Sequence, residues 1–334
     1  MKRAGRLISK IVHFDNLYEA YVKARRGKRQ NKGVVRFGKN IDEEILKIAE
    51  ELKNGTYELG NYFYFTVFDP KKRTICAAPF RDRVAMHAMM RICHPIFDDY
   101  QISGSYASRI GKGTYKAITD LKDKKKNGDM WFLKMDVVHY FDSVNHDILL
   151  YQLKSLFKDP VLLAIFERLI RGYEKTPNCG LPIGNLTSQY FANHYLSPAD
   201  HYLKEKLRVK YLFRYMDDII VLDFDKKRIC EIAKVYSDFL RNNLKLQLHE
   251  PIINRCRYGV PFLGYIVYPY SVRLNHRSRR RFKSELSKLM VLYRMNTISE
   301  RKYRERMTAL YAFVNHADAN MFKKKILDIL GILP

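Results

Sequence analysis

The sequence predicts an α+β protein built from antiparallel hairpins and longer amphipathic helices. Apolar, β-prone runs lie on both sides of a short polar turn within 211–222, and a second pair of such runs covers 62–68 and 74–78. Apolar residues recur at helical spacing over 41–54 and 148–173. With 334 residues, 47% of them hydrophobic, the chain can bury a large core and form two or three subdomains.

The charge balance indicates a polyanionic partner. Lys and Arg number 61 against 35 Asp and Glu, which gives a formal net charge of +26. An excess of this size favours nucleic acid over an anionic membrane surface. No apolar run approaches the roughly 20 residues of a membrane span, and Met1–Gly5 leads into no signal-type segment. We therefore expect a cytoplasmic protein that does not associate with membranes.

The cysteines indicate a reducing compartment and no structural zinc. They are odd in number, scattered, and lack the paired spacing of metal ligands. The five positions are Cys76, Cys93, Cys179, Cys230 and Cys256.

Composition and motif order predict three regions. Residues 1–56 form a basic N-terminal extension, 57–270 the central domain, and 271–334 a basic helical region that would grip a phosphate backbone. The charge run at 24–32 also fits a merely solvated loop, but the surplus of cations elsewhere favours a nucleic-acid role.

Further elements follow from turn and helix signals. We expect a helix over 79–94 that ends at Pro95, and a long helix after the Gly/Pro loop 180–189 that runs to about residue 207. A single strand is expected over 262–268. The glycine-rich, basic loop 103–114 lacks the P-loop pattern and is interpreted as a loop that grips template or primer.

Three carboxylates mark the predicted site. Asp217 and Asp218 lie in the hairpin turn of 215–218, and Asp136 ends the apolar strand 130–136. Alone, an Asp-Asp pair fits a solvated turn and Asp136 fits a helix N-cap. Together they predict oxygen ligands for two magnesium ions, which would activate a hydroxyl and neutralise a leaving pyrophosphate. The chemistry indicated is that of a metal-dependent polymerase.

The ordered motifs resemble those of reverse transcriptases, over about residues 57–270. This resemblance implies a right-hand fold of fingers, palm and thumb, with an antiparallel palm sheet. It implies RNA-templated DNA synthesis, with template RNA, a primer or cDNA strand, deoxynucleoside triphosphates and two magnesium ions as partners. The matching segments are Lys71–Ile75, Arg81–Arg83, Phe132–Asp136, Tyr140–Asp142, Gly184–Gln189, Tyr215–Asp218 and Phe262–Tyr265.

The resemblance also implies roles for individual residues. Asp136 and Asp217 would be the main metal ligands, with Asp218 a third and Val137 contributing its carbonyl. The expected primer grip is Phe262, Leu263, Gly264 and Tyr265.

The nucleotide-binding residues are implied in the same way. Arg73 would contact the triphosphate. Phe141 falls at the steric-gate position, where a large ring excludes a 2′-hydroxyl, although a core aromatic is the plain alternative. Ile183, Gly184 and Gln189 belong to the loop and helix start that contact the incoming nucleotide.

This last loop departs from the retroviral and group II intron pattern, which begins Gln-Gly and ends Ser-Pro. The form Ile183-Gly184 with Ser188-Gln189 is similar to reverse transcriptases of diversity-generating retroelements. Those enzymes copy a template-repeat RNA with errors opposite adenine and work with a small, basic, oligomeric accessory variability protein. An Ile side chain removes polar contacts, and selectivity by hydrogen bonding is expected to weaken.

Two alternatives stay open. One is another prokaryotic reverse transcriptase, from a group II intron or a defence system. The other is an inactive RNA-binding scaffold with a polymerase fold, against which the intact Asp136, Asp217 and Asp218 argue. A lysine that often precedes the primer grip, a candidate proton donor to pyrophosphate, is missing between Leu246 and Phe262, so this role is unassigned.

Overall fold

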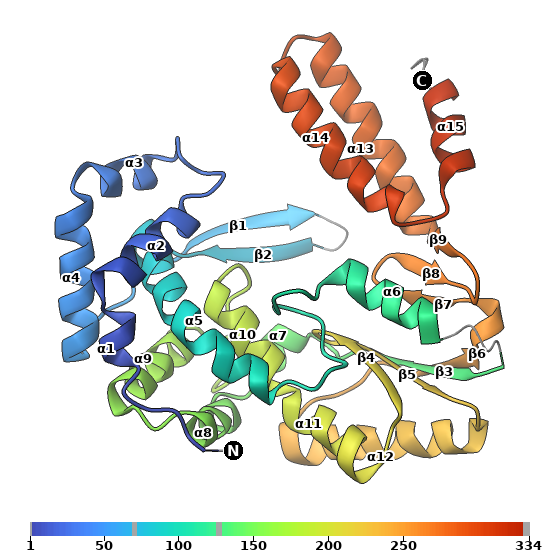
Figure 1. Ribbon diagram of the computed structural model, residues 1–334, viewed down its shortest axis with the longest axis horizontal. Helices are drawn as coiled ribbons and strands as arrows, with labels where there is room; N and C mark the ends of the chain where they lie inside the picture. Colours follow the sequence, from blue (N-terminus) through green and yellow to red (C-terminus); the bar gives the residue numbers. More distant parts are fainter. Residues whose placement is uncertain (1, 69–71, 125–128, 330–334) are drawn as a thin grey trace. The chain divides into compact units, whose positions relative to one another are not determined.

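The computed structural model describes residues 2–68, 72–124 and 129–329 (Figure 1). By their contacts the residues form two compact units, each assembled from separate stretches of chain. The predicted boundaries after residues 56 and 270 follow motif order rather than contacts, and they stay predictions. The first unit comprises Met1–Ser103, Val137–Lys206 and Val235–His249, and the second comprises Gly104–Asp136, Leu207–Lys234 and Glu250–Pro334.

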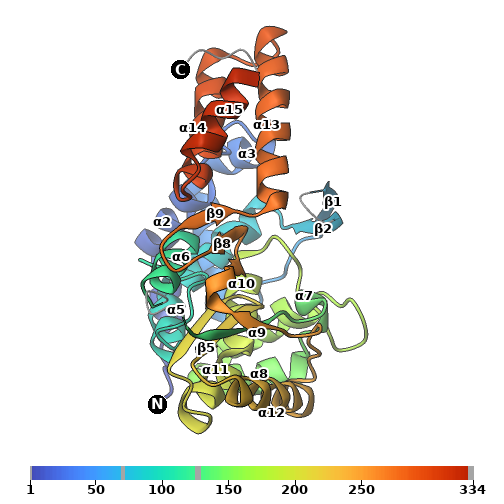
Figure 2. The same ribbon diagram turned by 90° about the vertical axis from the view of Figure 1, so that its right-hand side faces the viewer.

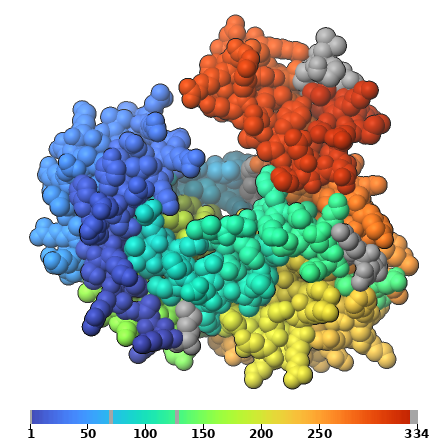
Figure 3. All heavy atoms as spheres, in the orientation of Figure 1, coloured from blue at the N-terminus to red at the C-terminus, as the bar shows by residue number. Residues whose placement is uncertain are grey.

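The first unit is built around helix α5 (Phe80–Tyr100). The N-terminal helices pack against it, and Figure 3 shows their blue surface lying directly on the α5 segment. The rings of Tyr21 and Phe37 stack with their centroids 5.5 Å apart, and the ring of Phe80 packs edge-on against Phe37 at a centroid distance of 5.3 Å. The basic N-terminal region therefore contributes to this unit's core. Its helices are α1 (Ile8–Ile11), α2 (Phe14–Ala24), α3 (Lys32–Lys39) and α4 (Ile41–Asn54).

Helix α5 continues through Pro95, so the predicted end at this proline is wrong. A proline inside a helix removes one backbone hydrogen bond and costs about 3 kcal/mol. Packing beyond the proline offsets this cost. Phe97 is buried, and the centroid of its ring lies 5.3 Å from that of Phe157 and 5.6 Å from that of Tyr190.

The first unit also contains an antiparallel ribbon of two strands. In β1 (Phe63–Phe68) and β2 (Lys72–Ala77), Phe63 lies opposite Ala77 and Phe68 opposite Lys72. Both predicted strands are confirmed, but β2 begins at Lys72, two residues before the predicted start at residue 74, so Arg73 lies in the strand rather than in the turn expected between the two runs. The rest of that predicted turn, residues 69–71, lies outside the described residues.

The helix expected to run to about residue 207 is broken into shorter pieces. Pro198 lies in the first turn of the second piece, where its missing N–H interrupts the backbone ladder. The pieces are α10 (Leu186–Tyr195), α11 (Ser197–His201) and a π-helical turn (Tyr202–Lys206). Other helices of this unit are α7 (Tyr140–Ser143), α8 (His146–Leu156) and α9 (Pro160–Arg171), and α12 (Lys226–Leu244) leads into it from the second unit.

The second unit contains an antiparallel sheet of four strands in the order β4-β5-β3-β6. The hairpin predicted over 211–222 is confirmed, and the apolar strand before Asp136 pairs next to it. The strands are β3 (Trp131–Met135), β4 (Tyr211–Tyr215), β5 (Asp218–Asp223) and β6 (Ile252–Arg255).

A second antiparallel sheet has the order β7-β8-β9, and it corrects the single strand expected over 262–268. The chain instead reverses at Leu263 and Gly264, whose φ angles are +50° and +89°. Positive φ at both central residues is typical of a two-residue hairpin turn. The strands are β7 (Val260–Phe262), β8 (Tyr265–Val267) and β9 (Val272–Leu274).

Three helices complete the second unit: α13 (His276–Arg294), α14 (Glu300–Asn315) and α15 (Asn320–Ile329). Helices α13 and α14 run side by side in both ribbon views (Figures 1 and 2). One buried cluster joins them to both sheets and to α6 (Thr114–Lys124). In the part of the chain that the structure describes, no helix is long and apolar enough to cross a membrane.

Candidate active site

Strand pairing brings the predicted acids to one end of the four-stranded sheet. Met135 of β3 lies opposite Ile219 of β5, so Asp136 follows β3 beside Asp218. Tyr215 pairs with Asp218 across the β4–β5 hairpin, which leaves Met216 and Asp217 at its tip. The site therefore draws its carboxylates from two segments about 80 residues apart in the chain.

Lys134 forms an ion pair at this end of the sheet. Its Nζ donates to Oδ1 of Asp218 at 2.7 Å and to the carbonyl oxygen of Pro261 at 3.2 Å. Both side chains of the ion pair are about one-fifth exposed. Lys134 thus ties the carboxylate turn to strand β7.

The Asp218 carboxyl is subject to opposing electrostatic effects. Burial raises its pKa above the ordinary value, and the charge of Asp136 adds to the rise. Lys134 and the backbone N–H of Leu263, which donates to this carboxyl, lower the pKa. The influence of Asp136 agrees with the closeness of the two acids implied by the strand register.

The donor chemistry fits magnesium, which prefers carboxylate oxygens. When bound, such ions would lower the pKa of an attacking hydroxyl and stabilise charge on transferring phosphates. Within the described ranges, however, no three acidic, His or Cys side chains are grouped as a ready-made metal site. Because Lys134 engages Asp218, we expect Asp136 and Asp217 to provide the principal ligands, as the sequence predicts.

A buried guanidinium supports the carboxylate turn. Arg214 is fully buried, and its Nη1 donates to the carbonyl oxygen of Met216 at 3.1 Å. Its Nη2 donates to the Ser105 hydroxyl at 3.3 Å. The backbone N–H of Arg214 donates to the carbonyl oxygen of Gly104 at 2.8 Å, and its carbonyl oxygen accepts from the N–H of Tyr106 at 2.9 Å. Arg214 therefore fastens the hairpin tip to the loop at 103–114, for which the sequence predicted a nucleic-acid role.

The predicted primer grip divides into buried and accessible parts. Phe262 and Tyr265 are buried, and the Tyr265 hydroxyl donates to the carbonyl oxygen of Phe313 at 2.7 Å. Leu263 and Gly264 form the partly exposed turn between them. We therefore expect this turn to contact the primer strand, while the two aromatic residues pack in the core beside it.

The predicted nucleotide-binding residues lie in the first unit. The backbone N–H of Cys76 in β2 donates to the carbonyl oxygen of Ile183 at 2.8 Å. Gly184 has a φ of +120°, and a Cβ there would lie 2.8 Å from Cγ2 of Ile75. Glycine is required at 184 because the loop is pressed against β2, the strand that also carries the exposed Arg73.

Phe141 joins the same arrangement through its backbone. The N–H of Leu181 donates to the Phe141 carbonyl oxygen at 2.8 Å, and the Phe141 ring is partly exposed. Gln189 is exposed on α10. Val137 is buried and forms an isolated antiparallel bridge with Leu248, also in the first unit.

Comparison with known proteins identifies the fold. Residues 69–267 match the family described as reverse transcriptase (RNA-dependent DNA polymerase). The chain belongs to the reverse transcriptase family. It carries that family's RNA-directed DNA polymerase domain, and its mixed helices and antiparallel sheets form a right-hand polymerase fold. The apo telomerase structure of Candida Tropicalis shares the fold, with a TM-score of 0.50 at 10% identity over 65% of this chain and 49% of that one.

Curated relatives of this reverse transcriptase domain are distant and longer. The COX1/OXI3 intron 1 protein of Saccharomyces cerevisiae is 26% identical over 174 residues, which cover 49% of this chain and 21% of the yeast protein. Protein YkfC of Escherichia coli is 25% identical over 175 residues, covering 49% of this chain and 46% of YkfC. The chain thus spans less than half the length of these two relatives.

The contact between Lys134 and Asp218 predicts a measurable coupling. Lys134→Met leaves the mostly buried carboxylate without its ammonium, and we expect the free energy of unfolding to fall by about 1–3 kcal/mol. Adding Asp218→Asn should recover most of that loss. Urea denaturation of both single variants and the double variant measures the coupling, and additive losses would contradict it.

Proposed function

We propose that this reverse transcriptase makes error-prone, adenine-mutagenised cDNA from a template-repeat RNA in a diversity-generating retroelement. The observation that carries the proposal is Ile183. Its backbone is fixed to β2 through Cys76, and its side chain is partly exposed at the loop expected to contact the incoming nucleotide. An aliphatic group there offers no hydrogen bond by which a mismatched nucleotide could be rejected.

The remaining parts of the site support polymerase chemistry. Asp136, Asp217 and Asp218 would hold two magnesium ions, and Phe141 would select deoxynucleotides through its ring. The net charge of +26 suits an RNA template and a growing cDNA strand. We include a small basic accessory variability protein as a partner and the cytoplasm as the compartment.

A second candidate is a reverse transcriptase of a group II intron or a defence system. The similarity to an intron protein of yeast favours this candidate. An inactive RNA-binding scaffold is the least supported alternative, because three acids at one sheet end repel one another unless cations offset their charge. Each candidate predicts a different product.

Sequencing the cDNA distinguishes the candidates. The purified chain, with its accessory protein, magnesium, a primed RNA template and deoxynucleotides, should extend the primer with errors at least about tenfold more frequent opposite adenine. Ile183→Gln should lower the adenine errors toward the level at other bases, whereas Ile183→Leu, which stays apolar, should not.

Errors spread evenly over the four template bases would reject the retroelement proposal and leave the second candidate. Absence of extension would favour the scaffold.

A further inference from the structure

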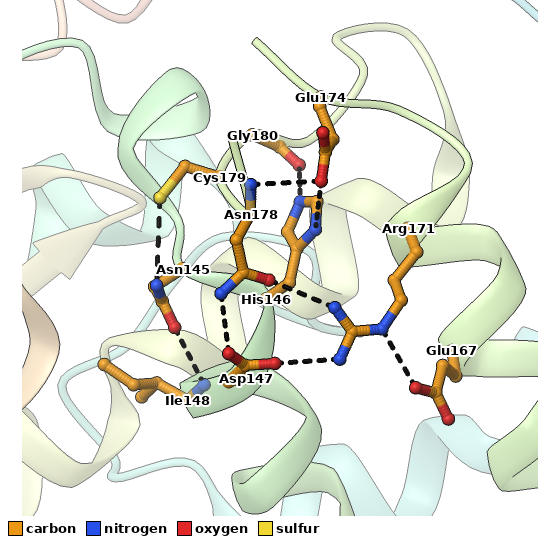
Figure 4. Close-up of polar contacts among 10 residues, drawn as sticks. All are labelled: Asn145, His146, Asp147, Ile148, Glu167, Arg171, Glu174, Asn178, Cys179 and Gly180. Carbon is orange, nitrogen blue, oxygen red and sulfur yellow. Dashed lines mark hydrogen bonds and ion pairs between the residues drawn. The ribbon is translucent and has the colours of Figure 1, made fainter. Parts of the chain in front are cut away.

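One imidazole is completely buried in the first unit where α8 begins (Figure 4). Nε2 of His146 lies 2.8 Å from the carbonyl oxygen of Gly180. Because a carbonyl only accepts, Nε2 must carry the hydrogen. Nδ1 has no hydrogen-bond partner among the described residues and faces Oε1 of Glu174 at 3.9 Å. The loop that follows α9 therefore holds the imidazole through its Nε2–H.

Backbone hydrogen bonds hold this loop along the segment from α7 to α8. The N–H of His146 donates to the carbonyl oxygen of Asn178 at 2.9 Å. The N–H of Gly180 donates to the carbonyl oxygen of Val144 at 2.9 Å, and the N–H of Leu181 donates to the carbonyl oxygen of Phe141 at 2.8 Å. The carbonyl oxygen that receives the imidazole lies between these two donors in the chain. His146 thus adds a buried side-chain hydrogen bond to these backbone hydrogen bonds.

The loop itself closes tightly at Gly180. Its φ is +123°, and a Cβ there would lie 2.8 Å from the backbone nitrogen of Lys175. The N–H of Lys175 in turn donates to the carbonyl oxygen of Cys179 at 2.8 Å. This geometry narrows the backbone conformations open to residue 180, and the imidazole of His146 provides a hydrogen-bond donor to the Gly180 carbonyl oxygen.

Beyond Gly180 the loop connects two predicted parts of the nucleotide pocket. Leu181 is bonded to the backbone of Phe141, and two residues later Ile183 is bonded to Cys76 of β2. Residues 180–183 therefore connect the backbone of Phe141 to the backbone contact between Ile183 and β2. We infer that the course of these residues affects the space beside the Phe141 ring, which a ribose 2′-hydroxyl would meet if Phe141 is the steric gate.

We propose that His146 is a positioning residue that sets sugar selectivity by fixing the loop of Ile183 against the segment of Phe141. This inference rests on the proposed polymerase function. Because His146 is completely buried, it acts through the Gly180 carbonyl oxygen rather than on the nucleotide directly. Loss of its donor lets the loop move away from Phe141, which loosens binding of the deoxynucleotide and admits the 2′-hydroxyl.

An exposed set of contacts holds the same loop from outside (Figure 4). Asp147 accepts from Nδ2 of Asn178 at 2.6 Å and from Nη2 of Arg171 at 2.8 Å. Nε of Arg171 donates to Glu167 at 2.9 Å. Asp147 and Glu167 are thus two exposed acids on one arginine, and Asp147 also bonds to the loop. They form a matched pair for mutation.

The test measures deoxynucleotide and ribonucleotide incorporation by the full chain on a primed RNA template. His146→Leu keeps much of the volume and removes the donor, whereas His146→Gln keeps an N–H at similar reach. For His146→Leu we expect the KM for deoxynucleotide to rise about fivefold to tenfold and the kcat/KM selectivity against ribonucleotide to fall about tenfold. The kcat should change less than about twofold, and His146→Gln should restore most of the selectivity.

The exposed pair decides the question if His146→Leu does not fold. Asp147→Ala should lower selectivity about twofold to threefold, as expected when a surface contact is lost, and Glu167→Ala should leave it unchanged. Unchanged selectivity in both His146→Leu and Asp147→Ala, with an active wild type, would overturn the positioning role alone. Equal effects of Asp147→Ala and Glu167→Ala would also overturn it. A wild-type chain that extends no primer would overturn the proposed function and this inference together.

Discussion

Asp217→Asn should lower the single-turnover rate of primer extension by about 10³-fold or more. The substitution removes one of the proposed carboxylate ligands at the tip of the β4–β5 hairpin, and a catalytic ion held there would supply several kcal/mol of transition-state stabilisation. Rapid-quench measurement with saturating primer, RNA template and deoxynucleotide reports this step. Circular dichroism and primer–template binding should remain close to those of the wild type.

Asp223→Asn is the matched control for this prediction. Asp223 is the last residue of the same strand, β5, which begins at Asp218. Its Oδ2 forms an ion pair with Nη1 of Arg228 at 3.2 Å. We expect its extension rate to stay within about threefold of the wild type, because Asp223 lies at the other end of β5 from the turn that carries Asp217. Equal losses in both variants would indicate a general effect of charge on strand β5 rather than a role for the turn.

Arg214→Met should reduce both stability and activity. The substitution fills similar space but removes the guanidinium hydrogen bonds to the Met216 carbonyl oxygen and the Ser105 hydroxyl. We expect the free energy of unfolding to fall by about 2–4 kcal/mol. Primer extension by the folded fraction should fall at least about tenfold, since the turn that carries Asp217 loses its support.

Arg214→Lys separates charge from geometry in this prediction. An ammonium keeps the positive charge but cannot donate in two fixed directions to Met216 and Ser105. We therefore expect only partial recovery of stability in urea denaturation and of the extension rate. Full recovery would mean that charge alone is needed at this position.

Local patterns were sufficient to predict the strands that carry the acids. Apolar runs around 215–218 and before Asp136 correctly predicted a hairpin and a neighbouring strand. Two adjacent acids at the hairpin turn distinguished this segment from an ordinary strand pair. The family resemblance then matched the comparison with known reverse transcriptases over residues 69–267.

Where prediction failed, tertiary contacts outweighed the local signal. Pro95 is a strong stop signal, yet burial of Phe97 keeps α5 intact beyond it. At Leu263 and Gly264 the chain reverses direction although the sequence stays apolar. Only the positive φ angles of these two residues distinguish the turn from a continuing strand.

The supporting residues of the site were also missed, although two left a weak signal. Arg214 is a charged residue within an apolar strand, and Lys134 precedes Asp136 by two, which places both on one face of the sheet. His146 left no signal of this kind. Its function depends on Gly180, which lies 34 residues away and meets it only in the folded chain.

The most direct test of the account is divalent-ion binding at the end of the sheet. Manganese, which can replace magnesium as a paramagnetic probe, is titrated into the chain with a primed RNA template and a non-hydrolysable deoxynucleotide, and bound ions are followed by electron paramagnetic resonance. We predict two bound ions in the wild type, and a loss of at least about tenfold in affinity for Asp136→Asn and for Asp217→Asn but not for Asp223→Asn. Undiminished binding in the first two variants would contradict the assignment of the active site.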